Sequence, residues 1–141
     1  MMTTEQKQIL LQDLCGRLPY GVIGLYTWKN KKSYNRELTG CLYDELKSSW
    51  NSTEDSQFSP YLRPMSSMTE EEYKDLEERF CWNFADIFDK NRFSIEIGYS
   101  VDIDEVQEFI DWLNQHHFDY RGLIEKGLAL EAPEGMYNNK I

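Results

Sequence analysis

The sequence has few of the residues that mark catalytic, metal or disulfide sites. It contains two histidines and three cysteines, and Cys15, Cys41 and Cys81 are odd in number and too far apart for a Cys-x-x-Cys pair. We therefore expect reduced, mostly buried thiols and no disulfide framework. Gly-x-Ser-x-Gly, glycine-rich phosphate loops and paired zinc-ligand motifs are all absent from the sequence. This pattern predicts no catalytic residues, no metal ligands and no cofactor.

Long apolar runs are also missing. No segment approaches the roughly 20 apolar residues of a membrane span, and residues 1–8 lack the apolar core of a signal peptide. We expect a soluble, intracellular protein without membrane association. Of the 141 residues, 40% are hydrophobic and 14% are aromatic, which is too much apolar side chain for a disordered chain. The length then predicts a single domain, residues 1–141.

Positive charge is scarce in one region only. The formal net charge is −10, and residues 69–111 contain 14 acids against four bases, whereas the flanks hold 11 of each. An acidic face repels nucleic-acid backbones and attracts basic proteins. The sequence therefore argues against direct nucleic-acid binding. Two interpretations stay open, because such a surface either only improves solubility or docks on a basic partner.

Helical spacing of apolar residues predicts about three helices. The first runs from about Thr4 to Cys15, where Thr3 is the N-cap and Gly16 suits the C-terminal end. The second begins at Glu70 with a Thr69–Glu72 capping box and extends to about Phe88. A third begins after Asp102 and ends near His116, with Val106, Phe109, Ile110 and Leu113 on its inner face.

Three segments carry strand patterns. Residues 20–28 are rich in β-branched and aromatic side chains, residues 37–46 are a second extended candidate, and residues 93–99 alternate apolar and polar. Gly24 and Gly40 mark bulges or close approaches of other backbone. The polar composition of residues 47–59 predicts an exposed loop containing Trp50. Pro60 to Pro64 favour extended, polyproline-like backbone, which is either a recognition segment with Tyr61 and Arg63 projecting or a rigid entry into the next helix. The fold class we expect is α+β, with about three helices on a small, mainly antiparallel sheet.

Several blocks of the sequence resemble a known family. They are the segments 18–22, 60–72, 111–124 and 127–132, which include Leu-Pro-Tyr-Gly-Val and Trp-Leu-Asn-Gln-His-His-Phe-Asp-Tyr-Arg-Gly. The chain is similar in these blocks to a family of uncharacterised proteins from phages, prophages and mobile elements of Bacteroides and related gut bacteria. This resemblance implies a small accessory protein in the cytoplasm of the bacterial host. It carries over no activity and no functional residues.

Residues 110–137 combine histidines, aromatics, an Arg-Gly step and a Pro-Glu-Gly turn. Adjacent histidines at a helix end point about 100° apart, so they do not chelate one metal as an i, i+4 pair does. One histidine together with Asp119 or Glu125 has the chemistry of an acid–base pair. The alternative is structural, with one histidine capping helix carbonyls and Phe118 and Tyr120 anchoring the segment. The candidate binding residues are Glu71, Glu78, Glu108, Trp112, His116, His117, Tyr120 and Arg121.

Three hypotheses about function follow. The first is a non-enzymatic accessory protein that binds another protein, with the acidic region inhibiting a basic host protein. The alternative is a small hydrolase or ligand-binding domain that uses residues 116–121. The third is a homo-oligomeric accessory subunit, which an exposed group of tryptophans would indicate.

Overall fold

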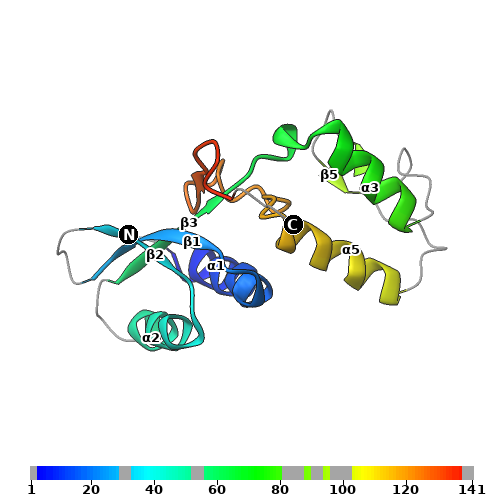
Figure 1. Ribbon diagram of the computed structural model, residues 1–141. Helices are drawn as coiled ribbons and strands as arrows, with labels where there is room; N and C mark the ends of the chain where they lie inside the picture. Colours follow the sequence, from blue (N-terminus) through cyan, green and yellow to red (C-terminus); the bar gives the residue numbers. More distant parts are fainter. Residues whose placement is uncertain are drawn as a thin grey trace.

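A mixed sheet of four strands lies in the part of the molecule built mainly by the N-terminal residues (Figure 1). The computed structural model describes residues 3–28, 33–51, 56–80, 88–89, 94–95 and 103–137. Within these ranges the strands are β1 (Ile23–Thr27), β2 (Tyr34–Glu37), β3 (Gln57–Leu62) and β6 (Leu130–Glu131), in the spatial order β2-β1-β3-β6. The β1–β2 and β1–β3 pairs are antiparallel, and β6 runs parallel to β3.

The close contact that the sequence predicts at Gly24 lies between β1 and β3. Gly24 pairs with Pro60, and a Cβ atom at Gly24 would lie 2.3 Å from the ring of Phe58, which is fully buried. Glycine is required here because the aromatic ring occupies the space of any larger side chain. Pro60 fits into β3 since β6 pairs only with Tyr61 and Leu62 among the described strands, which leaves residue 60 at an edge.

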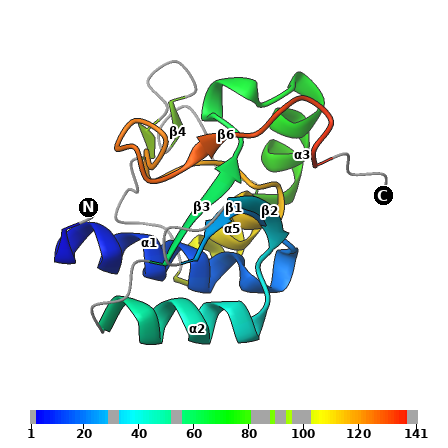
Figure 2. The same cartoon turned by 90° about the vertical axis from the view of Figure 1, so that its left-hand side faces the viewer.

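Two helices cover one face of this sheet. Figures 1 and 2 show α1 (Thr4–Arg17) and α2 (Gly40–Asn51) side by side beneath β1 and β3. The predicted Thr3 cap is confirmed, because Thr3 and Gln6 form a reciprocal capping box. The helix continues through Gly16 to Arg17, and the left-handed residue is Gly21, after the 3₁₀ turn η1 (Leu18–Tyr20).

Helix α2 corrects the predictions for residues 37–59. The expected strand over residues 37–46 is wrong, because β2 ends at Glu37 and Thr39 then accepts a hydrogen bond from the Leu42 amide. Leu42, Leu46 and Trp50 recur every four residues and are buried in the core under the sheet. The predicted exposed loop around Trp50 is also wrong, because its indole N–H donates to the Ser56 carbonyl at 2.6 Å. Residues 52–55 of that loop lie outside the described ranges.

Two further α-helices of the described residues form a second hydrophobic core. Helices α3 (Glu70–Phe80) and α5 (Ile103–Gln115) lie next to each other in Figure 1. Their buried cluster comprises Met65, Met68, Leu76, Phe109, Trp112, Leu113 and Phe118. The Thr69–Glu72 capping box is confirmed, since Glu72 N–H donates to Thr69 Oγ1 at 3.1 Å and Thr69 N–H donates to Glu72 Oε1 at 3.0 Å. The expected third helix is confirmed from Ile103, whereas its cap Asp102 lies outside the described residues.

Other expectations for residues 60–99 change in detail. Strand β3 includes residues 60–62, so the first part of the predicted polyproline-like segment is a strand of the sheet. Residues 63 and 64 then lead into the 3₁₀ turn η2 (Met65–Ser67). Helix α3 is described to Phe80, and Phe88 belongs to the short strand β4 (Phe88–Asp89) instead of continuing the helix. Strand β4 pairs with β5 (Ser94–Ile95), the described part of the expected strand over residues 93–99. Residues 81–87 and 96–99 lie outside the described ranges.

The described elements thus make an α+β fold, as the sequence predicts, with four α-helices where it indicates about three. The sheet is mixed because β6 is parallel to its neighbour. Cys15 and Cys41 are exposed, which corrects the expectation of mostly buried thiols, and Cys81 lies outside the described residues. No helix in the described part of the chain has both the length and the apolar character needed to cross a membrane.

After α5 the chain turns back towards the sheet. We call residues 130–137, which include β6, the C-terminal strap. Its last described residue, Tyr137, accepts the Ile23 N–H at 2.8 Å and donates to the Tyr61 carbonyl at 2.7 Å. The Ala132 amide also donates to the Leu62 carbonyl at 2.8 Å. The strap is therefore fixed to both β1 and β3 across the end of the sheet.

Candidate functional site

The predicted acidic residues lie on the outer surfaces of α3 and α5. Glu71 and Glu78 of α3 and Glu108 of α5 are all exposed. The two helices are joined by a hydrogen bond from the Trp112 indole N–H to Asp75 at 3.0 Å. The exposed acidic side chains therefore lie on two adjacent helices, and we call them together the acidic surface. Its exposed members are Glu70, Glu71, Glu77, Glu78, Asp104 and Glu108.

Trp112 is buried instead of forming part of an exposed binding site. Its ring stacks on His116 with centroids 3.9 Å apart and an interplanar angle of 24°. His116 Nδ1 lies 2.9 Å from the Trp112 carbonyl, so the imidazole closes the end of α5. Trp50 is buried as well, Trp28 is half-buried against the core under the sheet, and Trp82 lies outside the described residues. The described tryptophans thus provide no exposed group of the kind that the homo-oligomer hypothesis needs.

His117 is packed into the interior. It adopts a left-handed conformation with φ 64°, is 4% exposed and stacks on Tyr137 with ring centroids 3.7 Å apart. Its Nδ1 atom has no hydrogen-bond partner among the described residues. Burial, together with the nearby positive charges of Arg17 and Arg63, lowers the pKa of His117 to about 4. The imidazole is therefore neutral at pH 7.

Tyr120 and Arg121 contribute to a buried ion cluster that sequence reasoning missed. Arg17 and Asp13, both with fully buried side chains, pair at 2.7 Å, and Arg121 reaches the same carboxylate at 3.1 Å. Arg17 also donates to the Phe118 carbonyl at 2.6 Å. The two guanidinium groups each lie 5.2 Å from the centre of the Tyr120 ring. The i, i+4 spacing of Asp13 and Arg17 was a signal for the pair, but the sequence did not show its burial.

Among the residues proposed for an acid–base pair, His116, His117 and Asp119 are occupied by structural contacts, and Glu125 is exposed on the surface. Both oxygens of Asp119 accept backbone N–H groups, Leu123 at 2.8 Å and Ile124 at 3.0 Å, so this carboxylate caps the following turn. His116 and His117 are engaged by Trp112 and Tyr137. These contacts bring the residues 116–121 together as packing and capping groups, which argues against a hydrolase site built from them. Within the described residues, no set of three or more His, Cys, Asp or Glu side chains is placed to hold a metal ion.

Arg63 does not project freely, as the recognition-segment interpretation expects, but is held by contacts that the sequence did not predict. Its guanidinium donates to both oxygens of Glu72, at 2.8 and 2.7 Å, and contacts the carbonyls of Ser67 and His116. It also lies 4.3 Å from the centre of the Phe118 ring. Burial raises the pKa of Glu72, but the hydrogen bonds from Arg63 and Thr69 outweigh this effect, so the net pKa is lowered. The carboxylate is thus held in its charged form.

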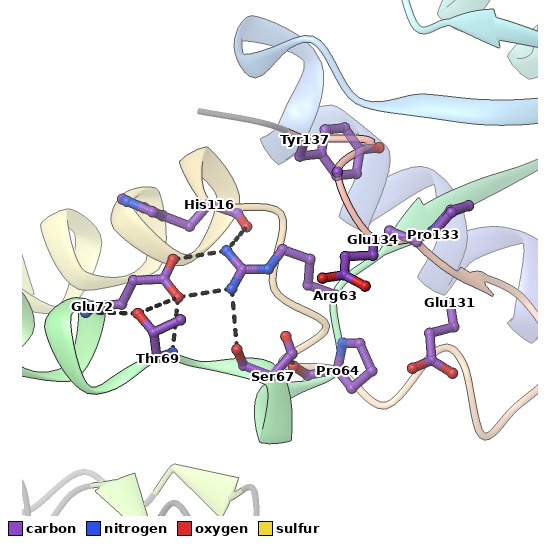
Figure 3. A pocket seen from close by; sticks show the side chains of 12 residues that line it. Arg63, Pro64, Ser67, Thr69, Glu72, His116, Glu131, Pro133, Glu134 and Tyr137 are labelled. Carbon is purple, nitrogen blue, oxygen red and sulfur yellow. Dashed lines mark hydrogen bonds and ion pairs between the residues drawn. The ribbon is translucent and has the colours of Figure 1, made fainter. Parts of the chain in front are cut away.

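This ion pair forms one wall of a cavity of about 700 Å³ (Figure 3). The cavity lies where the end of β3, the start of α3, the end of α5 and the C-terminal strap meet. Figure 3 shows Glu72 and Thr69 on one side and Glu131 and Glu134 of the strap on the other. The imidazole of His116 points away from Arg63, and its carbonyl faces the guanidinium. The complete lining is Arg63, Pro64, Ser67, Thr69, Glu72, His116, Glu131, Ala132, Pro133, Glu134, Gly135 and Tyr137.

Comparison with known proteins adds no assignment: no protein-family model, no curated protein and no solved structure matches this chain. The geometry therefore carries the functional argument. It presents an acidic surface on α3 and α5 and a preformed polar cavity at the N-terminal end of α3.

Proposed function

We propose that the chain is a non-enzymatic accessory protein that binds a basic protein through its acidic surface. The observation that carries this proposal is the separation of charge within the structure. The two helices α3 and α5 together contain ten acids against two bases, Lys74 and Arg79, whereas Arg17, Arg63 and Arg121 outside these helices are each paired with a carboxylate of the same chain. The field outside α3 and α5 is therefore negative, and it favours encounter with a positively charged surface.

The family resemblance supplies the setting of this proposal. In that setting the protein acts in the cytoplasm of a Bacteroides host on behalf of a phage or mobile element, and its partner is a basic host protein that it inhibits. A nuclease of a defence system is a concrete example, because nucleases bind a negatively charged substrate. An acidic surface competes for the same positively charged groove.

The test is affinity capture from host lysate with matched charge variants. Glu71→Lys, Glu78→Lys and Glu108→Lys together raise the net charge by six without changing a buried residue. The control combines Glu5→Lys, Asp44→Lys and Glu125→Lys, three exposed acids outside α3 and α5, for the same change in charge. We expect one basic protein to be retained by the wild type and the control but at least tenfold depleted with the first variant.

Salt provides the second arm of this test. Exposed charges are screened at high ionic strength, so raising salt from about 0.05 M to 0.5 M should release the partner from the wild type. Equal retention of the partner by both triple variants, or retention that salt does not change, would refute the proposed function.

A further inference from the structure

We infer that the cavity beside Arg63 receives a single arginine or lysine side chain of the partner. This inference rests on the proposed function and names the contact that gives it specificity. The cavity is continuous with the acidic surface, because Thr69 and Glu72 line it and Glu70 and Glu71 occupy the same first turn of α3. A protein that docks on α3 therefore reaches the mouth of the cavity.

The charge of the walls favours a cation. Arg63 is already satisfied by both oxygens of Glu72 and by two carbonyls, so it offers little to an anionic ligand. Glu131 and Glu134 are exposed on the facing wall and form no ion pair with a described residue. Three carboxylates against one guanidinium leave an excess of negative charge around a concave space.

The shape and lining favour a long side chain over a small ion. About 700 Å³ lies in the size range of sites that hold organic ligands. Ala132, Pro133 and Tyr137 add apolar surface, which suits the aliphatic stem of a lysine or arginine while its charged head meets the carboxylates. The absence of a metal-holding cluster among the described residues agrees with this choice.

The walls are held in place before any partner binds. Arg63 ties β3 to α3 through a two-pronged ion pair. On the opposite side, Tyr137 and Ala132 fix the strap to the sheet backbone. A rigid site loses less conformational entropy on binding, so one inserted side chain contributes more to affinity here than at a mobile surface.

A model peptide tests the inference without the unidentified partner. The probe is acetyl-Gly-Arg-Gly-amide, titrated into ¹⁵N-labelled protein at low ionic strength and followed by amide chemical shifts, with acetyl-Gly-Gln-Gly-amide as the neutral control. We expect saturable shifts at Thr69, Ala132 and Gly135 with the arginine peptide only. Glu131→Gln with Glu134→Gln should weaken its apparent Kd at least threefold. Glu5→Gln with Asp44→Asn, which changes the net charge equally, should leave the Kd unchanged.

The outcomes separate this inference from the proposed function. If the arginine peptide changes amide chemical shifts on α3 and α5 but not in the cavity lining, the inference is overturned and the acidic surface remains the binding site. Equal shifts with the glutamine peptide, or equal loss of affinity in both double variants, would overturn it as well. A third outcome is that the shifts centre on the cavity while substitution of Glu71, Glu78 and Glu108 leaves partner capture unchanged. This would support the cavity as a binding site and refute the proposed function.

Discussion

Single arginine residues join parts of this molecule that are distant in sequence. Arg63 connects the end of β3 with α3 and with the carbonyl end of α5, and Arg17 connects α1 with the Phe118 carbonyl. Planar guanidinium groups suit these positions because they bond a carboxylate and carbonyl groups at the same time. The sequence predicted the Thr69–Glu72 box, since that contact is local, but it did not predict the Arg63 partner, which only the tertiary fold brings near.

His117 gives a testable pH dependence at the residue scale. Its pKa is about 4 in the folded state and near 6.5 when exposed, so the fold favours the neutral ring. The stability that comes from keeping His117 neutral is fully present above pH 6.5. As pH falls from 6.5 towards 4, the unfolded state takes up a proton that the folded state does not, so the free energy of unfolding falls by about 3 kcal/mol. Urea unfolding at pH 7 and pH 4.5 measures the loss.

The control for this prediction is His117→Asn, because asparagine tolerates the left-handed backbone and does not titrate. This variant should lose less stability than the wild type between pH 7 and pH 4.5. Identical losses in the two proteins would show that His117 is not the group responsible.

Secondary-structure elements were predictable where their signals are local. The caps at Thr3 and Thr69 and the spacing of Phe109 and Leu113 indicated α1, α3 and α5 correctly. Helix α2 was missed because its first half was interpreted as a strand and its serine-rich second half as a loop, although Leu42, Leu46 and Trp50 have helical spacing. The burial of that stripe against the sheet stabilises a helix that local composition disfavours.

Two glycines test the element-scale packing. Gly24→Ala places a Cβ 2.3 Å from the buried Phe58 ring between β1 and β3, and we expect a loss of about 1–3 kcal/mol in the free energy of unfolding. Gly40→Ala meets no atom within 4 Å at the start of α2. It should be neutral or stabilising by about 0.4–1 kcal/mol, because alanine has less backbone freedom in the unfolded chain.

Urea denaturation of both variants checks this pair. A Gly24→Ala protein as stable as Gly40→Ala would mean that the Phe58 ring moves freely, which its complete burial argues against.

At the scale of the whole molecule, the hydrophobic cores and the excess of acidic side chains lie in different places. One hydrophobic core lies under the sheet and a second lies between α3 and α5, while the excess acids face outward from these two helices. The sequence predicted the acidic region from its count alone. It did not predict the cavity, because Arg63, Glu72, Glu131 and Tyr137 come from segments that converge only in the folded chain.

The most direct test of the central claim is hydrogen exchange on the complex with the captured basic protein. Amides in the peptides covering residues 70–80 and 103–115 should exchange more slowly when the partner is bound, since the acidic surface is then covered. The same peptides from Glu71→Lys, Glu78→Lys, Glu108→Lys protein should show no such slowing. Protection confined to α1, α2 or the sheet, with α3 and α5 unchanged, would contradict the account.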